Sequence, residues 1–252
     1  MRSFKIIIAL LICGLGFSQN SQLFEEANTL YNEAQYYEAL DKYTQILDSG
    51  EHSAELYFNM GNAHYKLNNI APSIYFYEKA LLLKPNDKEI KNNIAFARNM
   101  TIDAIDKVPE IGFSSVVNKW ARSFHFETWA KISVGFSILF VMLFLFYYFS
   151  YSSFRKRFAF VTSTICLILV FVTLALTFHG QNLVQTNQPA IVFAKESQIK
   201  SEPNLRSTEA FKLHEGTKVQ VLDTVDNWKK IKIDDGKTGW VMNDDIKLVK
   251  SL

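Results

Sequence analysis

Side chains that could catalyse a reaction or bind a metal are few in this sequence of 252 residues. The five histidines are scattered, at spacings that match neither a zinc site nor a catalytic triad. Two pairs of adjacent carboxylates, Asp234–Asp235 and Asp244–Asp245, each lie beside an expected turn, and we interpret them as solvated turn residues. Because the sequence also lacks a glycine-rich phosphate loop, it predicts a protein that is not an enzyme and uses no cofactor or metal.

A helical region with an internal repeat runs from Ser21 to Ala104. Its apolar residues have helical spacing, and residues of similar type recur 34 positions apart, the period of a repeat built from two helices. Lys88–Ala104 adds one further helix, which we interpret as the terminal cap that stacked repeats require. The pairs in register are Ala27 with Gly61, Tyr31 with Tyr65, Ala39 with Ser73, Tyr43 with Tyr77, and Leu47 with Leu81.

The second copy resembles a tetratricopeptide repeat (TPR), in which small residues let two helices approach and aromatic rings fill the space between them. Pro72 enters the second helix early, which a helix tolerates in its first turn. The resemblance implies an all-α TPR solenoid. The residues that carry it are Tyr57, Met60, Gly61, His64, Tyr65, Tyr77, Ala80 and Pro85.

The TPR resemblance also implies an inner groove that binds an extended peptide. An equally open alternative is that its asparagines serve helix packing and solvation. Residues 19–110 contain fourteen Asp and Glu against eight Lys and Arg, a net charge of −6, which favours a protein partner over nucleic acid. The candidate groove residues are Asn28, Asn59, Asn62, Tyr65, Lys66 and Asn93.

Two apolar segments have the length of membrane-spanning helices. Ile132–Phe149 and Phe158–Phe178 contain 18 and 21 residues without a charge, enough to cross roughly 30 Å of hydrocarbon. The connection 150–157 carries three adjacent basic residues, so the positive-inside rule places it in the cytoplasm. We therefore predict a two-helix transmembrane hairpin in a bacterial inner membrane, with both flanking regions in the periplasm. The predicted spans are residues 130–149 and 158–178.

The segments before, between and after these parts also have recognisable sequence features. Residues 1–18 have two basic residues, an apolar run and small residues, which is typical of a secretory signal peptide. Residues 105–129 form a predicted amphipathic linker, whose helix either lies along the membrane surface or packs against the repeats. Residues 179–189 are polar and are interpreted as a second linker. The apolar face of the first linker consists of Phe113, Val116, Val117, Trp120 and Phe124.

The final segment, residues 190–252, changes from helical to strand periodicity. Short apolar runs alternate with turn pairs such as Asp235–Gly236, which predicts a compact all-β barrel. The strings His214–Thr217 and Gly239–Val241, with Asn227–Trp228 between them, resemble the bacterial SH3 (SH3b) family.

The SH3b resemblance implies an SH3-like small barrel with a groove for cell-wall peptides. The alternative is that its two tryptophans simply form the core of the barrel, which has few other large residues to bury. The candidate groove residues are Asp223, Asp226, Trp228 and Trp240.

The order of these parts resembles the BatE membrane proteins of the Bacteroides-type aerotolerance operon. That resemblance implies an inner-membrane component that works with other membrane proteins of the operon, some with von Willebrand A domains, in envelope or oxidative-stress tolerance. We predict a scaffold that binds protein partners through periplasmic TPR and SH3b modules. The alternative is a peptidoglycan-binding receptor or sensor that uses the SH3b module.

Overall fold

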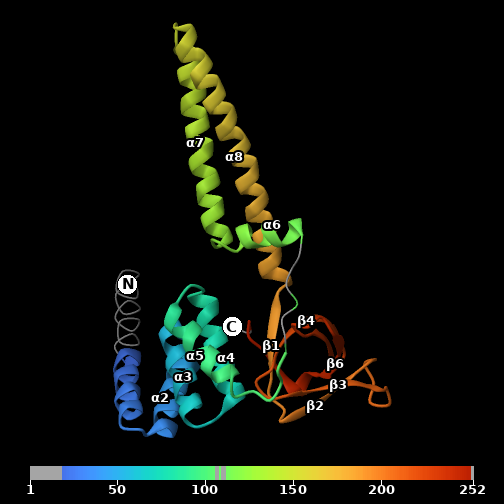
Figure 1. The fold of residues 1–252 in the computed structure, drawn as a ribbon. Helices are drawn as coiled ribbons and strands as arrows, with labels where there is room; N and C mark the ends of the chain where they lie inside the picture. Colours follow the sequence, from blue (N-terminus) through green and yellow to red (C-terminus); the bar gives the residue numbers. More distant parts are fainter. Residues whose placement is uncertain (1–18, 106–107, 109–111, 251–252) are drawn as a thin grey trace, which may run out of the picture. The chain divides into compact units, whose positions relative to one another are not determined.

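A computed structural model of the chain describes residues 19–105, 108 and 112–250. The chain divides into two compact units (Figure 1). The head unit joins the residues up to 107 with those from 188 onward, and the hairpin unit contains residues 108–187. Two modules far apart in the sequence, a helical module (residues 19–105) and a β module (residues 188–250), therefore belong to one body.

The helical module consists of antiparallel helix pairs. Ser53 begins its helix by accepting a hydrogen bond from the Leu56 N–H, and Asp87 accepts from the N–H groups of Glu89 and Ile90. The expected capping helix ends at Arg98, earlier than predicted, because the next residues cross over to contact the β module. The helices are an N-terminal helix over residues 19–32, α2 (Tyr36–Asp48), α3 (Ala54–Lys66), α4 (Ile70–Leu83) and α5 (Lys88–Arg98).

Close approach of α3 and α4 depends on small residues. A Cβ atom on Gly61 would lie 2.6 Å from Cδ1 of Tyr77, so only glycine fits against that ring. Ser73, which stands where TPRs usually have alanine, donates its buried hydroxyl to the Gly61 carbonyl at 3.0 Å. Pro72 lies at the third position of α4, within the first turn, where a helix tolerates proline.

The β module is a seven-stranded antiparallel sheet in the order β3-β2-β6-β5-β4-β1-β7. It is consistent with the expected SH3-like fold. Two turn glycines of this module have positive φ, Gly216 at +84° and Gly236 at +94°. The elements are β1 (Gln188–Val192), β2 (Glu196–Lys200), β3 (Glu209–His214), β4 (Lys218–Val225), β5 (Trp228–Lys232), β6 (Thr238–Met242), the 3-10 turn η1 (Asn243–Asp245) and β7 (Ile246–Leu248).

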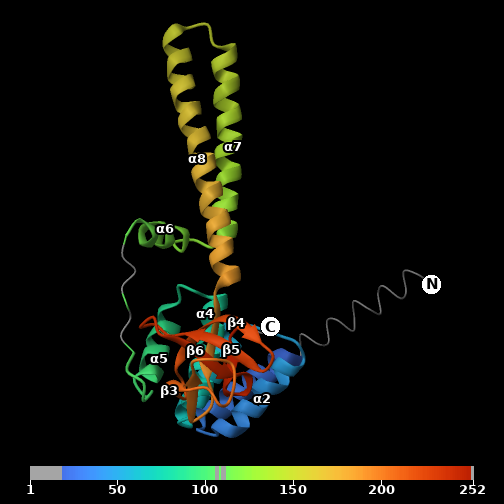
Figure 2. The same cartoon turned by 90° about the vertical axis from the view of Figure 1, so that its right-hand side faces the viewer.

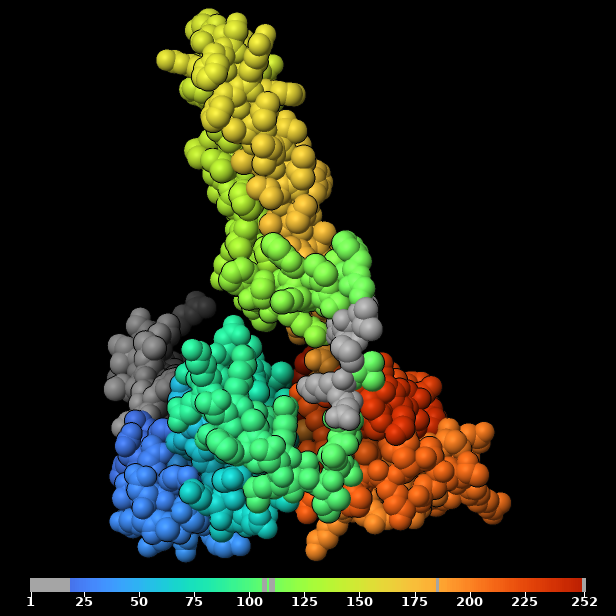
Figure 3. Space-filling view, in the orientation of Figure 1, coloured from blue at the N-terminus to red at the C-terminus, as the bar shows by residue number. Residues whose placement is uncertain are grey.

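The two modules of the head share a hydrophobic core. Ile191 and Val249 of the β module are fully buried among residues of α3, α4 and α5. The ring of Phe193 meets Tyr75 of α4 edge-on, with centroids 5.6 Å apart. Figure 3 shows the repeats (blue to green) in direct contact with the strands (orange to red). The two modules are therefore parts of one folded body, although the sequence suggested separate domains.

The hairpin unit contains two helices that are long and apolar enough to cross a membrane. It consists of α6 (Phe113–Ala121), α7 (Phe126–Phe149) and α8 (Ser153–Thr186). Most of the expected loop 150–157 is the first turn of α8, so the connection is only residues 150–152. The expected linker 179–189 is likewise the end of α8 followed by the start of β1. The predicted signal peptide, residues 1–18, lies outside the described residues.

Candidate functional site

The two repeats contain the same hydrogen-bonded network of an asparagine pair and a tyrosine. In the second repeat, Oδ1 of Asn62 accepts from the Tyr77 hydroxyl at 2.6 Å and from Nδ2 of Asn93 at 2.9 Å. In the first repeat, Asn28 accepts in the same way from Tyr43 at 2.7 Å and from Asn59 at 2.9 Å. Every member of the network recurs 34 positions later, which explains why these asparagines repeat.

The tyrosines of this network are buried, and burial affects their acidity. Desolvation raises the pKa of Tyr43 to about 12 and raises the pKa of Tyr77 as well. Both hydroxyls therefore stay protonated and act as donors to the asparagine carbonyl. Within the described residues, Nδ2 of Asn62 and Oδ1 of Asn93 have no protein partner, so each network keeps hydrogen-bonding capacity for a ligand.

A cavity of about 370 Å³ opens beside the second network. Its walls combine amide groups, which can pair with a peptide backbone, and aromatic rings, which can contact apolar side chains. One cation and one carboxylate also face it, and the carboxylate of Glu89 disfavours a site for a peptide C-terminus. The residues that line the cavity are Tyr31, Asn62, Tyr65, Lys66, Tyr77, Glu89, Asn93 and Phe96.

The structure brings four of the six predicted groove residues to this cavity. Asn28 and Asn59 instead form the equivalent network of the first repeat. Sequence reasoning missed Tyr31, Tyr77, Glu89 and Phe96 as lining residues. The 34-residue alignment pairs Tyr31 with Tyr65, so that signal was present, whereas Phe96 carried none. Ligand binding by these residues stays a prediction.

The two tryptophans of the β module are half-buried and lie on its outer face. Trp228 and Lys230 alternate with the buried Ile231 on β5, and Lys230 is paired in register with Trp240 on β6. The Lys230 ammonium lies 6.0 Å from the Trp240 ring centre. The alternative in which both tryptophans form the core is therefore wrong. The core is Ala190, Val192, Ile199, Leu213, Val219, Val221, Ile231, Ile233, Val241 and Ile246.

The predicted acidic residues lie near this tryptophan surface. Asp223 on β4 is exposed and stands opposite Lys230 in the register of β4 and β5. Asp226 is exposed in the turn between those strands, with a φ of 49°. An aromatic surface with mixed charges suits a polar ligand that carries both signs, such as a peptide.

No group of three or more histidine, cysteine, aspartate or glutamate side chains placed to hold a metal occurs in the part of the chain that the structure describes. His64 stacks flat on Phe76, with ring centres 5.4 Å apart. Burial lowers the pKa of His64 to about 4, so its ring is neutral at ordinary pH. The absence of enzymatic activity stays a prediction.

Comparisons with known families agree with this geometry. The family model for the tetratricopeptide repeat matches residues 54–87, which are α3, α4 and the turn that follows. The family model for the bacterial SH3 domain matches residues 197–247. The chain contains a TPR and a bacterial SH3 domain. No curated protein matches the chain.

The TPR and SH3 modules also meet through polar contacts, at a junction that sequence reasoning did not predict. Asp103 follows the TPR helices and accepts three hydrogen bonds from the SH3 module, from the backbone N–H and Nδ1 of His214, both at 2.7 Å, and from the Thr217 hydroxyl at 2.6 Å. Burial alone would raise the pKa of Asp103, but these hydrogen bonds outweigh it and lower the pKa below its usual range. Asp103 therefore stays ionised, and its hydrogen bonds hold the turn before β4 against the segment that follows the TPR helices.

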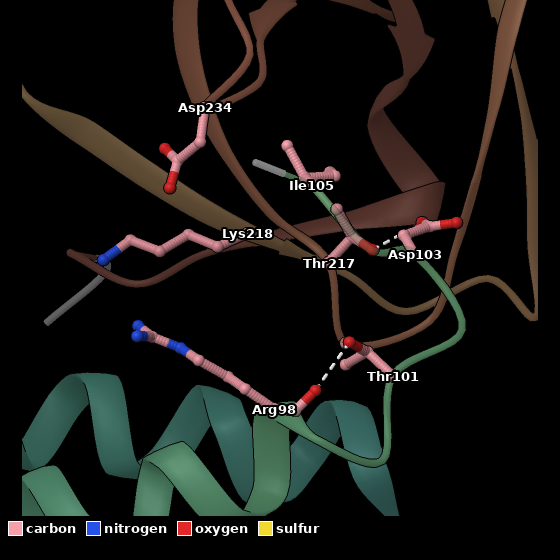
Figure 4. Close-up of a pocket in the computed structure, with 8 residues that line it drawn as sticks. Arg98, Thr101, Asp103, Ile105, Thr217, Lys218 and Asp234 are labelled. Carbon is pink, nitrogen blue, oxygen red and sulfur yellow. Dashed lines mark hydrogen bonds between the residues drawn. The ribbon is translucent and has the colours of Figure 1, made fainter. Parts of the chain in front are cut away.

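A second carboxylate joins the two modules. The Glu78 side chain on α4 is only 7% exposed and is held by Lys218 of the SH3 module, whose Nζ lies 2.8 Å from both carboxylate oxygens. Arg98 of α5 donates to the same carboxylate at 2.5 Å. Figure 4 shows Arg98 and Lys218 reaching into a cavity of about 210 Å³ between the modules. Two partly exposed cations therefore neutralise one buried carboxylate.

The turn glycine of the SH3 module completes the junction. A Cβ on Gly216 would lie 2.9 Å from Cγ2 of Ile70 and from Cγ2 of Thr101. Gly216 is thus needed both for its positive φ and for its contact with the TPR module.

Proposed function

We propose that this chain is a non-enzymatic, membrane-anchored scaffold whose TPR groove binds an extended segment of a protein partner. The observation that carries the proposal is the cavity beside Asn62 and Asn93, where amide groups without a protein partner lie among aromatic rings, of which Phe96 is exposed. Such a lining can pair with the backbone of a peptide and hold an apolar side chain.

The junction supports the proposal because it leaves this groove open. Contacts of α4 with the SH3 module use Ile70, Ile74 and Glu78, none of which lines the groove. The residues that line the groove all belong to the TPR module, so the SH3 module does not fill it. In this proposal the tryptophan surface of the SH3 module adds a second contact with the partner.

The membrane part of the proposal rests on α7 and α8, whose length and composition suit a bilayer. The basic residues at the start of α8 favour a cytoplasmic connection, with the head in the periplasm of a bacterial inner membrane. The resemblance to BatE proteins suggests von Willebrand A-domain membrane proteins as partners and a role in envelope or oxidative-stress tolerance.

Site-specific crosslinking of the full chain in its native membrane tests the scaffold. A photoreactive amino acid replaces Phe96, which is 60% exposed and lines the groove. The matched control replaces Tyr37 on α2, which is 69% exposed and does not line the groove. We expect a discrete protein adduct at position 96 that is lost with Lys66→Glu, and no such adduct at position 37.

Equal adducts at positions 96 and 37, or none at 96, would contradict groove binding. A reporter fused after Leu252 tests the topology separately, because it should be active only outside the cytoplasm. The two results are independent, so either half of the proposal can fail alone.

A second candidate is a peptidoglycan receptor or sensor, which the outward position of Trp228 and Trp240 favours. The detergent-solubilised full chain should then sediment with purified peptidoglycan, and Trp240→Ala should abolish sedimentation while Tyr37→Ala leaves it unchanged. If the protein does not sediment with peptidoglycan, the scaffold remains the better proposal.

A further inference from the structure

Helix α6 of the hairpin unit has an apolar face that no described part of the chain covers. Phe113 is 83% exposed, Trp120 is 60% exposed and Val116 is 53% exposed. Phe124, just after the helix, is 52% exposed and its ring meets Trp129 of α7 edge-on. Three large apolar side chains exposed on one short helix are unusual in water and indicate a docking surface.

The polar side of α6 is fixed to α8. Oδ1 of Asn118 lies 2.8 Å from Nε2 of His179, and Ala121 is only 2% exposed. A Cβ on Gly180 would lie 3.7 Å from the Ala121 carbonyl oxygen, so the two helices approach closely at this point. Contacts on one side of α6 thus leave its aromatic side turned outward.

The contact between α6 and α8 lies at the end of the apolar run of α8. His179 follows Phe178 directly, and Phe178 ends the uncharged apolar run of α8. Figure 2 shows α6 lying across the end of the hairpin where α7 begins. A helix held there lies at the boundary between hydrocarbon and water if the hairpin spans a membrane, which is where tryptophan and phenylalanine of amphipathic helices insert.

The charges at this end of the hairpin fit an acidic surface. Lys119, Arg122 and Lys131 are exposed, and Glu127 is the only acidic residue in the segment 112–131. Anionic phospholipid headgroups attract such cations close to the membrane surface. The apolar face and the charges therefore point to the same occupant.

We propose that α6 is an interfacial helix that inserts its aromatic face into the headgroup region of a membrane containing anionic phospholipids. The proposal rests on the membrane insertion of α7 and α8. It adds a lipid-binding surface to the scaffold and fixes how deeply the hairpin sits.

Spin labels on the full chain test the proposal. Cys13 and Cys166 are replaced by alanine, and single cysteines are introduced as Val116→Cys, Ser114→Cys on the exposed polar side of α6, and Met142→Cys on α7. The protein is reconstituted in vesicles of phosphatidylethanolamine and phosphatidylglycerol, and collisions with oxygen and with a water-soluble nickel complex are measured. We expect the nickel accessibility at position 116 to be roughly fivefold lower than at position 114.

The Met142→Cys label separates the two proposals. A lipid-exposed label at 142 together with equal nickel accessibility at 116 and 114 overturns the interfacial helix while the spanning hairpin stands. A label at 142 that the nickel complex reaches freely overturns the hairpin itself. Dipolar coupling between labels at 116 of different molecules would show that α6 binds a second copy, which also overturns the lipid proposal.

Discussion

The groove and the junction are two surfaces of one TPR module with opposite character. The groove is open, and its asparagines satisfy one another while keeping donors and acceptors for a ligand. The junction is closed, with Ile191 and Val249 fully buried and the Glu78 side chain only 7% exposed. Helix α4 contributes to both, since Tyr77 lines the groove and Glu78 is held at the junction, so one TPR helix can border an open cavity and also contact another module of the chain.

Of the changes that test this comparison, separating the two modules should destabilise the protein most. The SH3 module expressed alone would expose Ile191 and Phe193, and the TPR module alone would expose its side of the shared core. We expect both fragments to be unstable or to aggregate. Residues 19–105 joined to 188–250 by a flexible linker should instead unfold in one cooperative transition, measured by circular dichroism.

In that joined head, two independent transitions, or an isolated SH3 module as stable as the whole, would contradict a shared core. The experiment also shows whether the head folds without the hairpin.

Gly216→Ala should be the most damaging single substitution at the junction. Alanine is strained at a φ of +84°, and its Cβ would clash with Ile70 and Thr101. We expect a loss of about 2–4 kcal/mol in the free energy of unfolding. Gly236→Ala is the matched control, because its φ is +94° and no atom lies within 4 Å of the added Cβ.

The control should lose only about 1–2 kcal/mol, the cost of the backbone strain alone. Equal losses in the two variants, measured by denaturant unfolding, would mean that Gly216 contributes nothing to the junction.

The TPR helices and the junction should lose stability in different pH ranges. The pKa of His64 is lowered to about 4 in the fold from an unfolded value near 6.5, so the unfolded state binds more protons between these values. Stability should therefore fall on the order of 2–3 kcal/mol as the pH drops from 6.5 to 4. Asp103 has a lowered pKa and ionises below its unfolded value of 3.8, so its contribution should be lost only at still lower pH.

Thermal unfolding of the joined head at several pH values measures both effects. His64→Gln should flatten the curve between pH 6.5 and 4 and leave the loss at lower pH unchanged. An unchanged slope in that variant would contradict the assignment to His64.

Glu78→Gln should have the smallest effect of the four changes. The amide keeps the shape of the side chain but leaves Arg98 and Lys218 without their shared negative charge. We expect a loss of about 1–3 kcal/mol at neutral pH, measured by denaturant unfolding. Glu55→Gln is the control, since the ion pair of Glu55 with Lys84 is exposed and its loss should change little. Similar effects of the two variants would mean that Glu78 gains nothing from burial.

Much of the fold was predictable because its signals are local. The 34-residue period, the two uncharged apolar runs and the strand alternation each follow from neighbours in the chain. The asparagine and tyrosine positions of the groove followed from the same period. The position of Phe96 in the groove was not predictable, because the equivalent positions of the two earlier helices hold asparagine, Asn28 and Asn62.

The positions of the two tryptophans could not be predicted from the sequence, for a different reason. Composition suggested that a small barrel would bury its largest residues, and Trp228 and Trp240 were the obvious choices. In the fold, Ile191 and Val249 are buried against the TPR module, and the buried residues in the core of the sheet are all aliphatic. Because part of the core is shared with the TPR module, the small SH3 module does not need to bury its two tryptophans.

The sequence by itself determined the elements of this protein: the repeat helices, the apolar hairpin and the strands, since each depends on spacing within a short segment. Only the tertiary structure decided that the TPR and SH3 modules form one head. Asp103 and His214 are 111 positions apart, and no local pattern links them. Their pairing depends on the hairpin bringing the chain back to the helices it left, which no periodicity in the sequence records.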